Sequence, residues 1–310
     1  MLCERRHPPG LILTLVLAAV LLAGRSRAET PVSSADFPGV LYLVDSDANA
    51  PGFIVTSEDM ACAEPNLVVV THGWYERQAW PSSMATAIAR RVDRQQWQCG
   101  WYDWRVQARR LRPSHAAKMG REVAGPWLGN KIVTLSENWR HVHLIGHSAG
   151  VWVVNAAAET IARETTAEIH ITFLDAYVPD GWDEKALGRL AQTNPNRSWA
   201  DHYFTRDLLN LTENVLSGAH NVDVTAINPG IRGHLFPWHW YLATITGRYT
   251  TDDRFGDTPV FCQADGITYG FPRSREAGPA QWQRSVVLPP DSHPVHIGAE
   301  NPPHRSTGAR

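Results

Sequence analysis

The chain has 310 residues, of which 43% are hydrophobic and 19% charged, and its formal net charge is -2. This composition is typical of a globular protein, and the length suffices for one large domain. A net charge so close to zero excludes the strongly basic footprint of proteins that bind nucleic acid or anionic membrane surfaces.

The N-terminus has the pattern of a secretory signal peptide. Basic residues come first, the apolar run "LILTLVLAAVLLAG" follows, and Ser26 and Ala28 supply the small residues of a cleavage site. The sequence therefore predicts a signal peptide over residues 1–28, cut after Ala28, and a secreted or periplasmic mature protein. An uncleaved anchor is the alternative, although the apolar run is shorter than the roughly 20 residues of a spanning helix.

Short apolar runs alternate with helix-compatible segments from about residue 37 to 250. The predicted strands lie within 39–45, 66–74 (which ends in a glycine turn), 99–104, 141–146 and 169–180 (which runs out into a loop). Weaker strand candidates cover 199–205 and 221–228, and the predicted helices cover 82–92, 113–136 and 149–163. Such alternation favours crossover connections, and hence an α/β fold with a mostly parallel sheet.

The character of the chain changes near residue 252. The segments "PRSREAGPA" and "LPPDSHPVHIGAENPPHRSTGAR" are rich in proline, glycine and charge, with little periodicity. We therefore expect one domain over 29–252 and an irregular or partly disordered C-terminal extension over 253–310.

Removal of the signal peptide leaves three cysteines, Cys62, Cys99 and Cys262. An exported protein meets an oxidising compartment, so we expect one disulfide and one spare thiol, with the pairing open. None of the three has metal-site spacing. Two tripeptides, Asn196-Arg197-Ser198 and Asn210-Leu211-Thr212, fit the glycosylation pattern, which matters only in a eukaryotic secretory pathway.

The stretch "HLIGHSAG" contains the pattern G-x-S-x-G, with Ser148 between Gly146 and Gly150. An apolar strand precedes it and an alanine-rich helix follows, which is the context of a nucleophile elbow. A sharp turn makes the residues two before and two after the serine approach closely, so both must lack bulk. The adjacent side chain of His147 diverges from Ser148 on such a turn, and we expect it to support the elbow rather than act as the base.

The stretch "VVVTHGW" ends a second strand in His-Gly. A strand end of this kind is typical of the loop that supplies an oxyanion donor, and the backbone amide of Trp74 is the candidate. The amide of Ala149, at the start of the helix after the serine, is its predicted partner. An ordinary strand-end turn is the alternative. Five tryptophans near these motifs would suit an aromatic-walled pocket or plain core packing: Trp74, Trp101, Trp104, Trp238 and Trp240.

Together, "VVVTHGW", "WYDW", "HVHLIGHSAG" and "ITFLDAYVPD" resemble the catalytic domain of the pancreatic-type lipase family. This resemblance implies an α/β-hydrolase fold, with a mostly parallel central sheet and helices on both faces. It implies that Asp175 in "FLDAY" is the catalytic acid, although Ala176 replaces the proline of the family. It also implies that His234 in "GHLFPWHWYLATI" is the base.

Other residues compete for these roles. Asp201 lies on a late strand, where many other α/β-hydrolases place the acid, and the remaining acids in reach are Asp180, Asp183 and Asp223. His239, between two tryptophans, is the second choice for the base. We expect structural or surface roles for the other histidines, which are His72, His141, His143, His202 and His220. His141 and His143 face the same side of a strand, but no third metal ligand is evident.

These residues predict a secreted serine hydrolase that cleaves carboxylic esters, as a lipase, phospholipase or carboxylesterase, without a cofactor or metal. Its expected partner is an ester or lipid small molecule, with transient contact to a lipid surface and no nucleic acid. The oligomeric state stays open. The alternatives are a hydrolase of amide, peptide or thioester bonds and a catalytically silent binding protein of the same fold.

Overall fold

The computed structural model describes residues 38–45, 52–76, 79–206, 212, 215–228, 233–249, 260–264, 266–276 and 286–288. The chain divides into two compact units, residues 1–36 and 37–310, and all of the described residues belong to the second. The predicted signal peptide lies outside them. None of the helices in these ranges is long and apolar enough to span a bilayer.

A nine-stranded sheet forms the centre of this unit. Its strands, in spatial order, are β11 (Val286–Val287), β8 (His220–Asp223), β7 (Ser198–Phe204), β6 (Glu168–Leu174), β5 (His141–His147), β3 (Asn66–Thr71), β4 (Trp97–Asp103), β1 (Val40–Val44) and β2 (Phe53–Val55). Neighbouring strands from β11 to β4 are parallel, whereas β1 is antiparallel to both β4 and β2. The carboxyl ends of the parallel strands therefore lie at one edge of the sheet, where α/β proteins build their sites.

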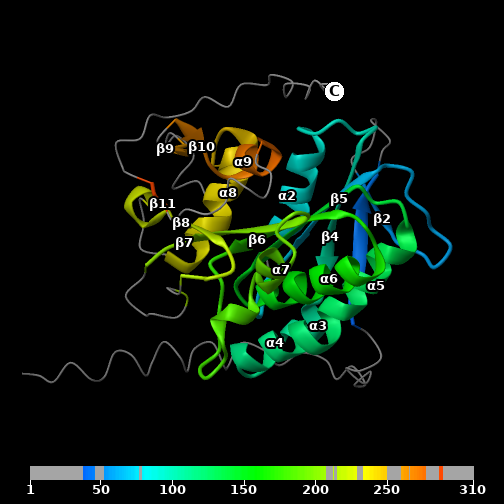
Figure 1. Cartoon of the computed structure of the whole chain (residues 1–310), viewed down its shortest axis with the longest axis horizontal. Helices are drawn as coiled ribbons and strands as arrows, with labels where there is room; N and C mark the ends of the chain where they lie inside the picture. The colour runs from blue at the N-terminus through cyan, green and yellow to red at the C-terminus, as the bar shows by residue number, and fades with distance from the viewer. Residues whose placement is uncertain are drawn as a thin grey trace, which may run out of the picture. The chain divides into compact units, whose positions relative to one another are not determined.

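Helices cover both faces of the sheet, as Figure 1 shows. One face carries α2 (Trp80–Ala89), α8 (Phe236–Thr246) and α9 (Phe271–Glu276). The other carries α3 (Arg105–Ala108), α4 (Pro113–Met119), α5 (Gly125–Leu135), α6 (Val151–Glu164) and α7 (Arg189–Thr193). A separate two-stranded ribbon joins β9 (Gln263–Ala264) to β10 (Ile267–Thr268).

The strands divide their side chains between two cores because successive residues point to opposite faces. Leu67 and Val69 of β3 pack into the core beneath α4, α5 and α6. Val68 and Val70 pack into the core beneath α2 and α8. Burial on both faces explains why the predicted central strands read as continuous apolar runs.

The predicted strands and helices are present, but several details differ. The expected helix over 113–136 is α4 followed by α5, with a π-helical turn between them at Gly120–Ala124. Prediction missed β2, whose three residues are all exposed and therefore give no burial pattern. The strand expected over 221–228 ends at Asp223, since Thr225–Ile227 form a 3₁₀ turn.

Part of the predicted C-terminal extension belongs to the core. Val260, Cys262, Tyr269, Phe271 and Leu288 are buried beside α8. The strand β11 also adds to the edge of the main sheet through β8. The described residues beyond 252 therefore pack on the same core as the residues before it.

The expected disulfide is absent, because Cys62, Cys99 and Cys262 are all free thiols. Cys62 packs against the core beneath α5 and α6, whereas Cys99 and Cys262 lie in the core on the opposite face of the sheet. Burial raises the pKa of Cys62 to about 11 and that of Cys99 and Cys262 to about 12. The thiols therefore serve as packing groups.

Candidate active site

Ser148 lies on a strained turn between β5 and α6. Its φ is +54°, in the left-handed region that residues other than glycine rarely adopt. The flanking glycines make this turn sterically feasible: a Cβ on Gly150 would lie 2.2 Å from the carbonyl oxygen of His72, and one on Gly146 would lie 2.7 Å from the carbonyl oxygen of Gly150. The geometry is that of a nucleophile elbow, as the G-x-S-x-G pattern predicts.

His234 reaches this turn from a different part of the chain. It lies in the 3₁₀ turn Gly233–Leu235, directly before α8. Its Nε2 is 3.0 Å from Ser148 Oγ, and its Nδ1 is 2.6 Å from Asp175 Oδ2. The three side chains therefore form one continuous chain of hydrogen bonds from hydroxyl to carboxylate. The imidazole is 35% exposed, so a ligand can approach it.

Asp175 follows β6, at the same edge of the sheet as Ser148. Its φ is +48°, a second strained position, and its side chain is fully buried. Oδ1 accepts a hydrogen bond from the backbone amide of Thr205 at 2.9 Å, and Oδ2 accepts one from Thr212 Oγ1 at 2.5 Å. Burial raises the pKa of Asp175, while the bonds from His234, Thr212 and Thr205 act in the opposite direction. The carboxylate is therefore held in one orientation toward His234.

Sequence reasoning missed Thr205 and Thr212. Thr205 comes directly after β7, the neighbour of β6 in the sheet, so the pairing of these two strands was the signal that could have found it. No sequence pattern marks Thr212 as a partner of Asp175, since its only motif is a glycosylation tripeptide. Its side chain is 1% exposed and bonded to Asp175, while Asn210 of the same pattern lies outside the described residues.

The loop after β3 packs directly on Ser148. A Cβ on Gly73 would lie 2.8 Å from the Cβ of Ser148, so only glycine allows this approach. The hydrogen bonds of the described residues include no acceptor for the backbone amide of Trp74. Ala149 is fully buried in the 3₁₀ turn Ser148–Gly150 that leads into α6. Ala149 thus adjoins the serine, and Trp74 follows the glycine that contacts it.

His72 fixes this loop to β4. Its Nδ1 donates to the carbonyl oxygen of Gly73 at 2.9 Å, and its Nε2 accepts from the backbone amide of Trp104 at 3.3 Å. Trp104 Nε1 donates in return to the carbonyl oxygen of His72 at 2.8 Å. The structural role expected for His72 is therefore confirmed.

His147 bonds to the loop of the predicted base and not to the serine hydroxyl. Its Nε2 donates to the backbone carbonyl of His234 at 2.9 Å, and the two imidazole rings are 4.8 Å apart. Burial and the neighbouring His234 lower the pKa of His147 well below its ordinary value. A neutral, buried imidazole that fixes the backbone of His234 agrees with the supporting role predicted from the turn.

The competing residues are engaged elsewhere. Asp201 accepts from Thr172 Oγ1 at 2.6 Å and from His170 Nε2 at 3.0 Å, while Asp223 is paired with Arg206. Asp180 and Asp183 are exposed, and His239 stacks on Trp238 at 3.6 Å. Across the ranges that the structure covers, no three His, Cys, Asp or Glu side chains are placed to hold a metal ion.

The tryptophans divide between surface and core. Trp104, Trp238 and Trp240 are fully buried, and Trp101 stacks on Tyr42 with ring centroids 4.7 Å apart. Of the five, Trp74 alone is exposed, at 38%. Core packing therefore accounts for most of the set, and Trp74 alone lies at the surface beside Ser148.

No protein-family model matches the sequence, and no curated protein matches it. Solved structures similar to the chain include an arylesterase, at 11% identity over 62% of this chain and 72% of that one, with a TM-score of 0.27. A poly(3-hydroxybutyrate) depolymerase from Bordetella parapertussis has 16% identity over 66% of this chain and 78% of its own, with a TM-score of 0.33. A Pyrobaculum calidifontis esterase has 15% identity over 72% and 85%, with a TM-score of 0.32.

The fold rests on the chain's own geometry. A mostly parallel sheet has helices on both faces, and Ser148 lies on a strained strand-to-helix turn at the carboxyl edge. Asp175 and His234 then reach it in that order along the chain, each from a later loop. This combination of topology and order defines the α/β-hydrolase fold, which confirms the predicted fold class.

Proposed function

We propose that the protein is a carboxylic ester hydrolase that works through an acyl-enzyme on Ser148. The observation that carries this proposal is the chain of hydrogen bonds from Ser148 Oγ through His234 to Asp175, 3.0 and 2.6 Å long, on a strained turn whose histidine is 35% exposed. The arrangement has a nucleophile, a base within reach of it, and a carboxylate that orients the base.

In the acylation step, Ser148 Oγ attacks the carbonyl carbon of the ester while His234 Nε2 takes its proton. The carbonyl oxygen becomes an oxyanion and accepts hydrogen bonds from the amides of Trp74 and Ala149. The intermediate collapses, the bond to the alcohol breaks, and His234 returns its proton to the leaving oxygen. Asp175 holds the Nδ1–H tautomer and stabilises the cationic imidazole.

In the second step, water attacks the acyl-enzyme. His234 takes a proton from the water, a second oxyanion occupies the same pair of amides, and the carboxylic acid is released as Ser148 recovers its proton. The chemistry uses only side chains and backbone of this chain, so the proposed reaction needs no cofactor.

The surroundings of Ser148 support an apolar acyl group. Trp74 and Tyr75 are 38% and 46% exposed, and Leu111 is 94% exposed. Trp74 Nε1 donates to the carbonyl oxygen of Arg110, which keeps Leu111 near Trp74. Exposed apolar groups beside a reactive site favour lipid or hydrophobic esters and transient contact with a lipid surface. The resemblance to pancreatic-type lipases supports the same substrate class.

Within this class we infer a lipase, phospholipase or carboxylesterase that acts outside the cytoplasm, after cleavage of the signal peptide following Ala28. Mass spectrometry of protein purified from the producing cell checks the cleavage, because the mature chain should begin at Glu29.

A hydrolysis profile tests the substrate class. Esters of one alcohol with acyl chains from C2 to C16 are compared with a phospholipid and a peptide, using Ser148→Ala as the control. We expect ester cleavage by the wild type and none above background by the variant. Cleavage of the peptide with a flat response on every ester would favour the amide-hydrolase alternative and contradict the proposal. The absence of turnover on all substrates would favour a silent binding protein.

A further inference from the structure

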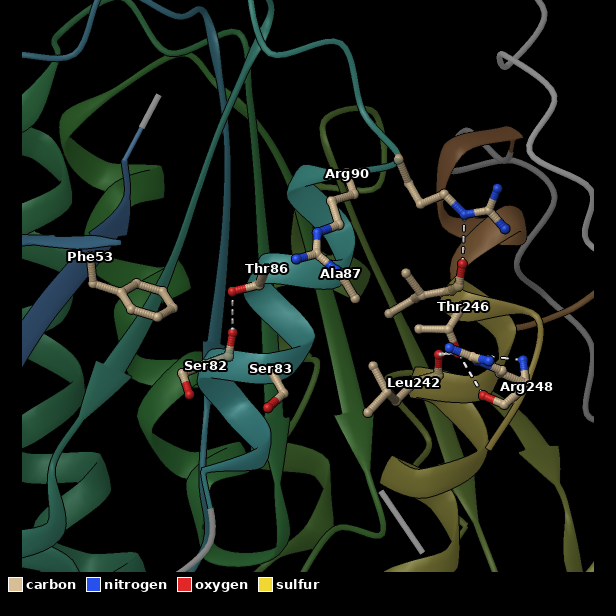
Figure 2. Close-up of a pocket in the computed structure, with 11 residues that line it drawn as sticks. Phe53, Ser82, Ser83, Thr86, Ala87, Arg90, Leu242, Thr246 and Arg248 are labelled. Atoms are coloured by element: carbon tan, nitrogen blue, oxygen red, sulfur yellow. Dashed lines mark hydrogen bonds between the residues drawn. The ribbon is translucent and has the colours of Figure 1, made fainter. Parts of the chain in front are cut away.

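A pocket lies over the outer parts of α2 and α8, with a volume of about 640 Å³ (Figure 2). It shares no residue with the candidate active site. Its lining comprises Phe53, Ser82, Ser83, Thr86, Ala87, Arg90, Arg91, Leu242, Ile245, Thr246 and Arg248. Both helices begin near the active site, and α8 alone carries its last residues about 15 Å from its first. A volume of this size is ordinary for a small-molecule site.

The charged residues of this pocket have one sign. Arg90, Arg91 and Arg248 contribute three guanidinium groups, and no Asp or Glu is among the lining residues. Arg91 Nε donates to the carbonyl oxygen of Ile245 at 2.6 Å, which holds that side chain at the end of α8. Arg90 and Arg248 are exposed, and neither pairs with a carboxylate in the part of the chain that the structure describes. The pocket therefore presents positive charge that an anion can neutralise.

Three of the four hydroxyl groups that line the pocket are hydrogen-bonded to backbone carbonyls. Thr86 Oγ1 donates to the carbonyl oxygen of Ser82, and Ser82 Oγ donates to that of Ala79. Thr246 Oγ1 likewise faces the carbonyl oxygens of Leu242 and Arg248. Their protons are directed at the backbone, so the guanidinium groups and the Ser83 hydroxyl are the donors available to a ligand. Guanidinium groups favour carboxylate and phosphate oxygens, which they bind with charge-assisted hydrogen bonds.

The same pocket has an apolar side. Leu242 and Ile245 line it from α8, and Ala87 lines it from α2. Figure 2 shows the labelled Leu242 projecting from α8 on the side that faces α2, with Arg248 farther along the same chain. A hydrocarbon chain can therefore lie against aliphatic side chains while a charged group stays among the arginines.

We propose that this pocket binds an anionic amphiphile. Arg90 and Arg248 hold its carboxylate or phosphate group, and Leu242 and Ile245 contact the first part of its hydrocarbon chain. A free fatty acid and a lipid phosphate share this chemistry. The binding claim does not depend on the proposed ester hydrolysis, because it concerns different residues and is measured without turnover.

Calorimetric titration tests the proposal on the full-length Ser148→Ala protein, with octyl phosphate and octanoate as probes. Octyl glucoside has the same chain without charge, and inorganic phosphate has the charge without the chain. The double variant Arg90→Gln/Arg248→Gln removes both cations. The matched control Arg163→Gln/Arg189→Gln removes two exposed arginines from α6 and α7, on the opposite face of the sheet. Ala87→Phe obstructs the apolar side without removing charge.

We expect octyl phosphate or octanoate to bind, and the preferred probe separates the phosphate source from the carboxylate source. The Arg90/Arg248 double variant and Ala87→Phe should each weaken binding tenfold or more, whereas the control pair changes it less than twofold. Equal binding to the Arg90/Arg248 variant, equal binding of octyl glucoside, equal binding of inorganic phosphate, or no binding of either amphiphile would each overturn the proposal. Unfolding midpoints equal to that of the parent protein exclude loss of fold as the cause.

Discussion

Two clusters in this molecule combine a hydroxyl group, histidine and aspartate, but they differ in backbone strain and in access to solvent. In the first, Ser148, His234 and Asp175 meet at the carboxyl edge of the sheet. In the second, Thr172 donates to Asp201 at 2.6 Å, His170 bonds to Asp201 at 3.0 Å, and His143 bonds to the Thr172 hydroxyl at 2.8 Å. The second cluster lies within β5, β6 and β7 beneath α9.

The two clusters differ in the backbone strain of the hydroxyl residue and in the exposure of its partners. Ser148 has a φ of +54° and faces an imidazole that is 35% exposed, with the Gly73 loop packed against it. Thr172 belongs to a regular strand and is fully buried with both of its partners. No substrate can reach such a hydroxyl, and its hydrogen bonds to Asp201 and His143 join three neighbouring strands in one packing arrangement. We therefore propose that the same residue types serve chemistry at the sheet edge and stability inside the sheet.

The largest expected effect is the loss of activity in the first cluster. Ser148→Ala and His234→Ala should each lower kcat by about 10⁴- to 10⁶-fold, because the nucleophile and base act as a unit. The free energy of unfolding should change by less than about 2 kcal/mol, since the removed groups leave no large cavity. Steady-state kinetics and urea unfolding measure the two quantities. His239→Ala is the matched control, and loss of activity there with full activity in His234→Ala would reverse the assignment of the base.

The second cluster should respond in the opposite way. Asp201→Ala leaves the Thr172 hydroxyl and His170 without their shared acceptor in a buried site, so we expect a loss of about 2–4 kcal/mol in the free energy of unfolding. The kcat/KM of the protein that stays folded should remain within about tenfold of the wild type, because Asp201 contacts none of the reacting groups. Asp175→Asn provides the contrast, with a large loss of kcat and a small loss of stability. A collapse of kcat in folded Asp201→Ala would refute this division.

Acid should weaken the fold through His202. This residue accepts from the amide of Ala176 through Nε2 and donates to Asn221 through Nδ1, and burial lowers its pKa to about 4. Between the ordinary pKa of 6.5 and 4, the unfolded chain binds the proton that the folded chain excludes, so stability falls as the pH falls. The expected loss across this window is about 3 kcal/mol.

The variant His202→Gln isolates this effect, because it keeps an acceptor for Ala176 but does not titrate. Urea unfolding of both proteins at a series of pH values from 7 to 4 should show the wild type losing stability relative to the variant. Parallel curves would mean that His202 contributes nothing to the acid sensitivity.

The smallest predicted effect concerns His147, which connects the elbow to the base. His147→Leu removes the donor to the backbone carbonyl of His234 and should lower kcat by about tenfold, with little change in KM, because the position of the imidazole loosens. His147→Gln retains a donor and should recover part of that loss. A change confined to KM, or equal losses in both variants, would show that the hydrogen bond does not position His234.

The sequence predicted the parts of the site that short-range rules control. The strand-turn-helix context identified the elbow at Ser148, whereas Asp175 was identified through the family resemblance. The divergence of neighbouring side chains on a sharp turn separated His147 from the base. His234 was identified through the family resemblance and its place after a glycine in a loop.

What could not be predicted depends on long-range contacts. Thr212 bonds to Asp175 across 37 positions in the sequence, and no pattern marks it. The strand β11 pairs with β8 through only two residues, which lie in a segment without periodicity. The buried network around Asp201 could not be predicted either, because the sequence around a strand histidine does not show whether the side chain bonds to a neighbouring strand or to solvent.

The central claim is that Ser148 is the nucleophile and that the second hydroxyl cluster is inert. Reaction of the folded wild-type protein with a fluorophosphonate probe, followed by mass spectrometry of its peptides, tests this most directly. The account predicts one adduct, on Ser148, that is absent in Ser148→Ala and in His234→Ala. An adduct on another residue, or equal labelling of Ser148→Ala, would contradict it.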